Sequence, residues 1–326
     1  MLAAGLLGWG LTGFVLLAAR NAHHLALPTS RGLHAIPTPV GGGLGIIGAT
    51  LAVWWLLNWP LPLLAIVVSG ALLALTALSW IDDRMPLPPA LRFAVHALVV
   101  GAVVSALPPS ARLFSMLPLG IERALIGFCW LWMLNLTNFM DGIDGLAGIE
   151  AVAVGTGYSV LVILFPGGSP MVAGLPDLAL VMAAAAAGYL YWNWAPARIF
   201  MGDVGSIPLG FLFGLLMLDL AFRGHRAAAL ILPLYFIADA TSTLLDRLRR
   251  NQRPWQAHRE HAYQRAVLGG MSHAEVTTHI AVLNMALMAL AVLSATMPLA
   301  AGVAAAVLTL ALIIWLRRRG PATAPE

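Results

Sequence analysis

Residues 122–165 read ERALIGFCWLWMLNLTNFMDGIDGLAGIEAVAVGTGYSVLVILF, two long apolar runs joined by a short acidic, glycine-rich connection. An apolar run of about 20 residues is long enough to cross a bilayer as an α-helix. A carboxylate at the centre of a bilayer costs roughly 2.5–3.5 kcal/mol. We therefore expect Asp141 and Asp144 at a membrane surface, at the break between two spans.

The rest of the chain repeats this pattern. Of its 326 residues 60% are hydrophobic and only 10% are charged, which is typical of a polytopic membrane protein. Further apolar runs, with the two above, lie at 1–19, 41–58, 62–80, 90–107, 122–139, 146–165, 178–194, 207–222, 228–246, 276–296 and 299–316. The sequence predicts an all-α, polytopic integral membrane helical bundle of about 11 transmembrane helices.

The distribution of arginine predicts the orientation. All 18 basic residues are Arg, and cytoplasmic loops of membrane proteins carry an excess of basic residues. If each run crosses once and the C-terminal Arg317, Arg318 and Arg319 are cytoplasmic, 14 of the 18 are cytoplasmic. The four outside are Arg112, Arg123, Arg223 and Arg226. We predict an outside N-terminus, a cytoplasmic C-terminus and acidic loops on the cytoplasmic face.

No shift in composition divides the chain, so residues 1–326 are predicted to form a single transmembrane catalytic domain. Its longest polar stretch, 247–275, is predicted to be a cytoplasmic substrate-binding loop within that domain. This stretch contains His258-Arg259-Glu260-His261-Ala262-Tyr263-Gln264-Arg265. On a helix, His258 and His261 share a face, as do His261 and Arg265, which suits a pyrophosphate. A solvated basic surface beside anionic lipid is the alternative.

Three acidic motifs predict a site for phosphate and a divalent cation. Asn135, Asn138, Asp141 and Asp144 recur every three residues, so on a helical or near-3₁₀ path they present oxygen ligands on one face. The turn 202–206, Gly-Asp-Val-Gly-Ser, opens a helix and offers amides for a phosphate and the Asp203 carboxylate for Mg²⁺.

The adjacent acids Asp82 and Asp83 end another apolar run. If they are desolvated, the pKa of one rises, which suits a base; a solvated helix end is the alternative. Two other segments are less specific. Phe200 is available to stack on a nucleotide base, and Arg31 and His34 lie in a loop rich in proline and glycine that suits either an anion or a tight connection.

In this order, Asp82-Asp83, Asn138-x-x-Asp141-Gly-x-Asp144-Gly, Phe200-Met-Gly-Asp203-x-Gly-Ser206 and the His258/His261 loop resemble the polyprenyl-phosphate N-acetylhexosamine-1-phosphate transferases, glycosyltransferase family 4. The resemblance covers about residues 25–270. The histidine loop is more similar to that of enzymes that initiate O-antigen (lipopolysaccharide) or related surface glycans than to that of the peptidoglycan translocase. The resemblance implies an enzyme of the bacterial cytoplasmic (inner) membrane, with its active site on the cytoplasmic face.

The implied reaction transfers N-acetylhexosamine 1-phosphate from a UDP-sugar to undecaprenyl phosphate, giving undecaprenyl-diphospho-sugar and UMP. The resemblance makes Asp203 and Asn138 ligands of Mg²⁺, with Mn²⁺ as an alternative metal. The catalytic candidates are Asp82, Asp83, Asp141 and Asp203. The candidates for substrate binding are Asn135, Asp144, Phe200, His258, Arg259, His261, Arg265, Arg31 and His34.

The expected partners are a UDP-N-acetylhexosamine, undecaprenyl phosphate, membrane lipid and a second copy in a homodimer, with no nucleic acid. A transporter or flippase of a phosphorylated or lipid-linked substrate is the alternative class. Such proteins usually place ionisable residues near mid-bilayer, and Asp239 is the residue that approaches that depth. A CDP-alcohol phosphotransferase would need Asp-Gly-x-x-Ala-Arg, which the stretch from Asp141 does not supply.

Overall fold

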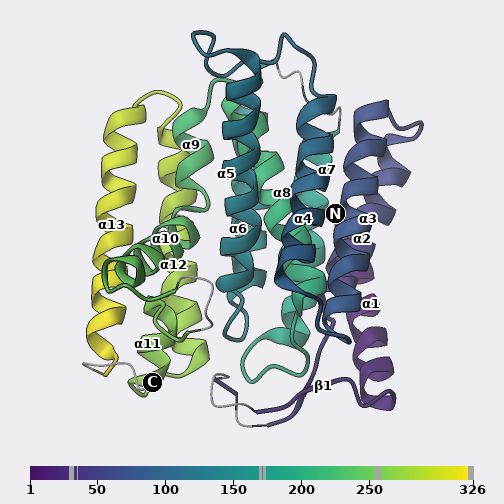
Figure 1. Ribbon diagram of the computed structural model, residues 1–326, viewed down its shortest axis with the longest axis vertical. Helices are drawn as coiled ribbons and strands as arrows, with labels where there is room; N and C mark the ends of the chain where they lie inside the picture. The colour runs from purple at the N-terminus through teal and green to yellow at the C-terminus, as the bar shows by residue number, and fades with distance from the viewer. Residues whose placement is uncertain (29–32, 35, 169–170, 172–173, 254–257, 322–326) are drawn as a thin grey trace.

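The computed structural model in Figure 1 describes residues 1–326 except 29–32, 35, 169–170, 172–173, 254–257 and 322–326. The helices are α1 Leu2–Asn21, α2 Gly43–Asn58, α3 Leu63–Asp82, α4 Pro89–Ala106, α5 Leu119–Phe139, α6 Leu146–Leu164, α7 Leu175–Asn193, α8 Asp203–Phe222, α9 Arg226–Ile231, α10 Leu234–Arg249, α11 Ala262–Leu268, α12 His273–Leu293 and α13 Pro298–Arg319. Two short strands, β1 Leu25–Ala26 and β2 Thr38–Pro39, pair antiparallel. The prediction of an all-helical, polytopic membrane protein is confirmed.

The predicted number of spans is too high. In the described part of the chain, nine helices are long and apolar enough to cross a membrane, and α2, with 16 residues, is a shorter tenth candidate. The run 228–246 is not one continuous helix, because the chain breaks between α9 and α10 at Leu232-Pro233. Proline has no N–H to donate and its ring clashes with the preceding helical turn. The polar side chains of α10 also make it unlike a continuous apolar span.

Helix α8 is the centre of the bundle (Figure 1). It is the most deeply buried of the candidate spans and packs against α2, α3, α5, α6 and α9. At its first turn it meets the start of α2 so closely that a Cβ on Gly43 would overlap Gly205. Glycine is required there because the two backbones are in contact. This contact fixes the position of Asp203, the first residue of α8.

The acidic motifs lie at one end of the bundle, and the arginines that the sequence predicted to be outside lie at the other. α3 and α5 end, and α8 begins, at the lower end in Figure 1, where all the acidic motifs lie. At the other end, Arg112 pairs with Glu122, and Arg226 donates to the Leu113 carbonyl at 3.0 Å. This separation agrees with the arginine pattern. The orientation of the bundle in the membrane stays a prediction.

Candidate active site

Asp83, the residue after α3, caps the first turn of α8. Its carboxylate accepts hydrogen bonds from the backbone N–H groups of Asp203 and Val204, both at 3.2 Å. These N–H groups have no acceptor within the helix, and the helix dipole favours a negative charge beside them. Burial, and next the charge of Asp203, raise the pKa of Asp83 to about 6. Asp83 therefore joins two helices and also exchanges a proton near neutral pH.

Glycine at 202 makes this contact between α3 and α8 possible. Gly202 has φ of +76°, in the left-handed region that side chains disfavour. A Cβ there would lie 2.8 Å from the nearer carboxylate oxygen of Asp83. Any larger residue would therefore both strain the turn and displace Asp83 from the start of α8.

Arg92, in the first turn of α4, lies between two of the aspartates. Its guanidinium is 2.6 Å from Asp82 Oδ2 and 3.6 Å from Asp203 Oδ2. The other oxygen of Asp82 accepts the Leu87 N–H at 2.7 Å. Asp82 is thus the ion-paired member of the adjacent acids. The motifs did not reveal Arg92, because a single arginine ten residues after Asp82 in the sequence is not distinctive.

Asn138, in the last turn of α5, completes the acidic cluster. Its amide donates to Asp203 Oδ1 at 2.7 Å and to the Ser206 hydroxyl at 3.0 Å. Asp141 follows at the bend after α5, where its N–H donates to the Asn138 carbonyl at 3.2 Å. Burial, and then the charges of Asp203 and Asp83, raise the pKa of Asp141 well above its usual value. Three helix ends therefore bring these predicted residues together.

The first loop holds Phe200 through its backbone. The Phe200 N–H donates to the Pro39 carbonyl at 2.8 Å, and the Gly42 N–H donates to the Phe200 carbonyl at 2.9 Å. The His34 ring lies near the Phe200 ring, at a centroid distance of 5.0 Å in an edge-on arrangement. The loop therefore positions the partly exposed Phe200 ring. Arg31, the other predicted residue of this loop, lies outside the described residues.

Asp144 and Asn135 make contacts that shape the surrounding chain. Asp144 Oδ2 accepts the Ala197 N–H at 3.0 Å, and its Oδ1 lies 3.2 Å from Nδ1 of His273. These contacts join the bend after α5 to the loop before α8 and to the start of α12. The Asn135 amide donates to the Leu131 carbonyl of its own helix at 2.7 Å. A role for either residue in substrate binding stays a prediction.

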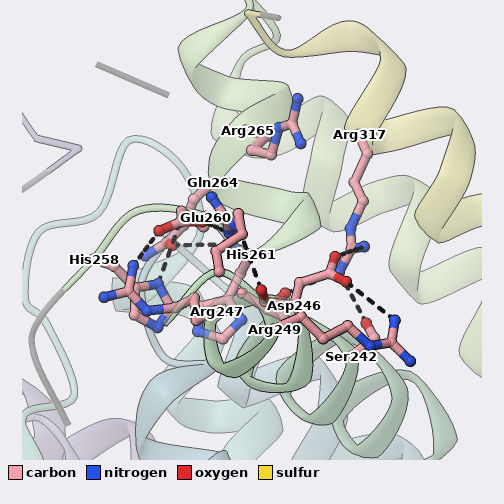
Figure 2. A network of polar contacts seen from close by, with 12 residues as sticks. Ser242, Asp246, Arg247, Arg249, His258, Glu260, His261, Gln264, Arg265 and Arg317 are labelled. Atoms are coloured by element: carbon pink, nitrogen blue, oxygen red, sulfur yellow. Dashed lines mark hydrogen bonds and ion pairs between the residues drawn. The ribbon is translucent and has the colours of Figure 1, made fainter. Parts of the chain in front are cut away.

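Two arginines hold the histidine loop through Glu260 (Figure 2). Arg247 and Arg250, at the end of α10, both pair with the Glu260 carboxylate. Burial would raise the pKa of Glu260, but the hydrogen bond of Arg250 and the charges of both arginines lower it. The loop 258–260 is not helical, and His261 is the N-cap of α11. The predicted shared helix faces are therefore wrong, although the rings of His258 and His261 are only 4.8 Å apart.

His261 connects this loop to the acidic cluster. Its ring is stacked with the Phe139 ring, at a centroid distance of 6.4 Å, and with the Tyr263 ring, at 5.8 Å, and the Tyr263 hydroxyl donates to the Phe139 carbonyl at 2.8 Å. Phe139 is the last residue of α5, directly after Asn138. Burial lowers the pKa of both His258 and His261 to about 4, so both rings are neutral at pH 7. Each neutral ring carries one N–H donor; the His258 ring is partly exposed, whereas His261 is 2% exposed.

The two remaining predicted residues of the loop are placed differently. Arg259, which lies between His258 and Glu260 in the sequence, is partly exposed. Arg265 lies in the last turn of α11, and its guanidinium donates to the Pro321 carbonyl beyond α13 at 2.9 Å. Figure 2 shows Arg265 apart from the two histidines. The structure therefore does not bring Arg265 to the acidic cluster.

The donor set fits a magnesium ion. Among the described residues, no three His, Cys, Asp or Glu side chains converge as a complete metal cage. Mg²⁺ is usually held by one or two protein carboxylates and completes its shell with water and substrate phosphates. The Asp203 carboxylate and the Asn138 side-chain oxygen are the donors that would hold it. Repulsion among the neighbouring carboxylates of Asp83, Asp141 and Asp203 is the feature that a cation would relieve.

An acidic cluster at one end of a helical membrane bundle, beside a loop with aromatic and histidine side chains, suits an enzyme that transfers phosphate groups at a membrane surface. Comparison with known proteins identifies the family. Residues 64–221 match glycosyl transferase family 4. The chain belongs to this family of polyprenyl-phosphate N-acetylhexosamine-1-phosphate transferases, and the resemblance predicted from the motifs is confirmed.

Two relatives align along most of the chain. A probable undecaprenyl-phosphate N-acetylglucosaminyl 1-phosphate transferase of Bacillus subtilis is 26% identical over 257 residues, 76% of this chain and 70% of the relative. A decaprenyl-phosphate N-acetylglucosaminephosphotransferase of Mycolicibacterium smegmatis is 28% identical over 313 residues, 83% of this chain and 75% of the relative. A phospho-N-acetylmuramoyl-pentapeptide-transferase of Mycobacterium ulcerans is 40% identical, but over 124 residues, or 34% and 33% of the two chains.

Proposed function

We propose that the enzyme transfers N-acetylglucosamine 1-phosphate from UDP-N-acetylglucosamine to undecaprenyl phosphate. The products are undecaprenyl-diphospho-N-acetylglucosamine and UMP. The reaction takes place on the cytoplasmic face of the inner membrane and begins the synthesis of a lipid-linked surface glycan such as O-antigen. The sugar and the class of lipid follow the names of the two long-aligning relatives.

The observation that carries the proposal is the meeting of Asp83, Asn138 and Asp203 at the ends of three membrane helices. A water-soluble nucleotide sugar and a membrane-bound acceptor can both reach such a place. Phosphoryl transfer needs positioning and stabilisation of charge more than covalent help from the protein. A bound Mg²⁺ would neutralise the charge that develops on the phosphates.

Each residue of the candidate site then has a defined role in the reaction. Asp83, whose pKa is about 6, takes the proton from the acceptor phosphate. An oxygen of that phosphate attacks the phosphorus bound to the sugar, the bond to the UMP oxygen breaks, and UMP leaves. Arg92 balances the charges of Asp82 and Asp203. His258 and His261 donate to the donor diphosphate, and Phe200 stacks on uracil.

The transporter alternative loses the residue on which it relied. Asp239 is completely buried and accepts the Ala262 N–H at 2.8 Å, so its carboxylate is used in packing α10 against α11. Such a group is not available to a substrate that crosses the membrane.

The test is an assay of purified protein in detergent with undecaprenyl phosphate and a panel of UDP-sugars. We expect Mg²⁺-dependent release of UMP and formation of a lipid diphosphosugar, with UDP-N-acetylglucosamine the best donor. Asp203→Asn should abolish turnover while the protein still inserts, because a neutral amide holds Mg²⁺ more weakly than a carboxylate. Folded wild-type protein that releases no UMP from any UDP-sugar would refute the proposal.

A further inference from the structure

Helix α10 carries a buried acid that the reaction does not use. The Asp239 side chain is 0% exposed, on a face that also presents Ser242, Thr243 and Asp246. A buried carboxylate without partners is strongly destabilising, so its contacts indicate why the fold tolerates it.

Asp239 holds the start of α11. Both carboxylate oxygens accept the backbone N–H of Ala262, at 2.8 and 3.0 Å. The Tyr235 hydroxyl donates to it at 3.2 Å and the Thr243 hydroxyl at 3.3 Å. Ala262 directly follows His261, the N-cap residue. The Asp239 carboxylate therefore fixes the backbone from which the His261 ring projects.

Arg317 supplies the balancing charge from the last turn of α13. Its guanidinium lies 3.9 Å from Asp239 Oδ1. It also donates to the hydroxyls of Ser242 and Thr243, at 2.8 and 3.0 Å, and to Asp246 at 3.3 Å, as Figure 2 shows in part. These contacts lock the guanidinium onto α10. The final helix of the chain thus reaches the same carboxylate that caps α11.

We propose that Asp239 and Arg317 are positioning residues, a clamp of α10, α11 and α13 that sets the place of His261 over the donor diphosphate. The inference rests on the proposed function, because it assigns the clamp to the donor side of that reaction. Neither residue contacts substrate. They act through the Ala262 backbone on His261, whose ring stacks on Phe139 beside Asn138.

The clamp predicts an effect on one substrate only. The acceptor phosphate is served by Asp83 at the end of α3, which α10 does not hold. Displacement of α11 should therefore weaken transition-state contacts to the donor and leave acceptor binding alone. A general loss of structure would instead change both Michaelis constants together with the yield of folded protein.

The test uses full-length protein with four variants, Asp239→Asn, Arg317→Met, Arg317→Lys and the double variant Asp239→Asn/Arg317→Met. Arg319→Met is the matched control, because Arg319 is exposed on the same helix and lies over the Trp315 ring, 4.9 Å from its centroid. Size-exclusion chromatography monitors folding. Kinetics with varied donor and acceptor is combined with hydrogen exchange of residues 262–268 without substrate.

We expect Asp239→Asn and Arg317→Met to lower kcat/KM for the donor by about 10- to 100-fold, with KM for the acceptor unchanged within about twofold. Arg317→Lys should keep most of the activity. The double variant should resemble the worse single variant, because both residues act through one carboxylate. Exchange of the α11 amides should become about tenfold faster in both single variants, and Arg319→Met should match wild type.

Normal donor kinetics in Asp239→Asn, unchanged exchange of α11, or additive losses in the double variant would each overturn the clamp. The two proposals fail in different ways. Wild-type protein that turns over no UDP-sugar refutes the proposed function, and the exchange comparison then decides by itself whether Asp239 and Arg317 hold α11.

Discussion

Replacing Asp83 by Asn separates its two roles, capping α8 and accepting a proton. The amide oxygen can still accept the N–H groups of Asp203 and Val204, which lie 3.2 Å from the present carboxylate. A hydrogen bond to a charged group contributes about 1.5–3 kcal/mol and one to a neutral group about 0.5–1.5 kcal/mol. The weaker hydrogen bonds of the amide cost about 1–2 kcal/mol, but the raised pKa of Asp83 means that burial and the charge of Asp203 cost the ionised carboxylate more than these bonds return. We therefore expect Asp83→Asn to keep or slightly raise the melting temperature of the metal-free protein at pH 7.5.

The effect on turnover should be much larger. A general base contributes about 10²–10⁴-fold, so Asp83→Asn should lower kcat at least about 100-fold in an assay of UMP release. Asp83→Ala should lose the same activity and more stability, because it leaves two N–H groups without their acceptor. Asp82→Asn is the comparison, since it breaks the 2.6 Å pair with Arg92 but removes no base.

The pH profile identifies the cause. An acceptor phosphate monoester has a second pKa of about 6, near the pKa of about 6 for Asp83. In wild type the reactive state holds one proton, with Asp83 ionised and the acceptor phosphate still singly protonated, so kcat/KM against pH should be bell-shaped with its maximum near pH 6. In Asp83→Asn no base takes that proton, so the low remaining activity should rise with pH to a plateau as the acceptor phosphate loses its second proton. A bell-shaped profile in the variant, or activity within tenfold of wild type, would show that Asp83 is a cap and not the base.

Three further perturbations test the site. Asn138→Ala removes the 2.7 Å hydrogen bond to Asp203 and should lower kcat/KM by about 10- to 100-fold and raise the Mg²⁺ concentration needed. Thr137→Val is the control, because that hydroxyl donates within its own helix to the Met133 carbonyl, and equal losses in both variants would argue against a metal role. Phe200→Ala should raise KM for the UDP-sugar several-fold with kcat nearly kept, whereas an unchanged KM would make Phe200 a packing residue. Because folding raises the pKa of Asp83 to about 6, the stability that this carboxyl contributes to the metal-free protein is present in acid and is lost as pH rises through 6. His258 and His261, whose pKa burial lowers to about 4, change stability in the opposite direction, so the measure is wild type compared with Asp83→Asn. The melting temperature of wild type minus that of Asp83→Asn should be more positive at pH 5 than at pH 7.5, Mg²⁺ should raise the melting temperature of wild type mainly at pH 7.5, and a difference that does not depend on pH would contradict the assignment.

Hydropathy predicted most of the fold because a membrane span needs only length and apolar composition. It failed at 228–246, where the apolar side chains of Ala, Leu and Ile raise the mean hydropathy and so hide the polar side chains. The periodic spacing of Asp239, Thr243 and Asp246 on one face, together with Pro233, was the signal of a break. Average hydropathy does not contain that information, but helical periodicity does.

The motifs predicted that Asp83, Asn138 and Asp203 meet, but not how they are paired. The resemblance predicted Asn138 and Asp203 as ligands of one metal ion, and their side chains are in contact at 2.7 Å. The cap that Asp83 places on α8 joins residues 120 apart and depends on how α3 packs against α8. The helical spacing of His261 and Arg265 was misleading, because α11 begins only after His261. Such pairings follow from tertiary packing, which one sequence does not specify.

Because α8 is buried, the geometry of the active site should not depend on the thickness of the membrane. Bilayers of different thickness impose hydrophobic mismatch, which helices relieve by tilting. Helices α1, α4 and α13 are the least buried of the candidate spans, whereas α8 is the most buried and its first turn touches α2 at Gly43. Asp203 begins that buried helix. The distances around it should therefore stay the same in thin and thick bilayers, while the outer helices absorb the adjustment.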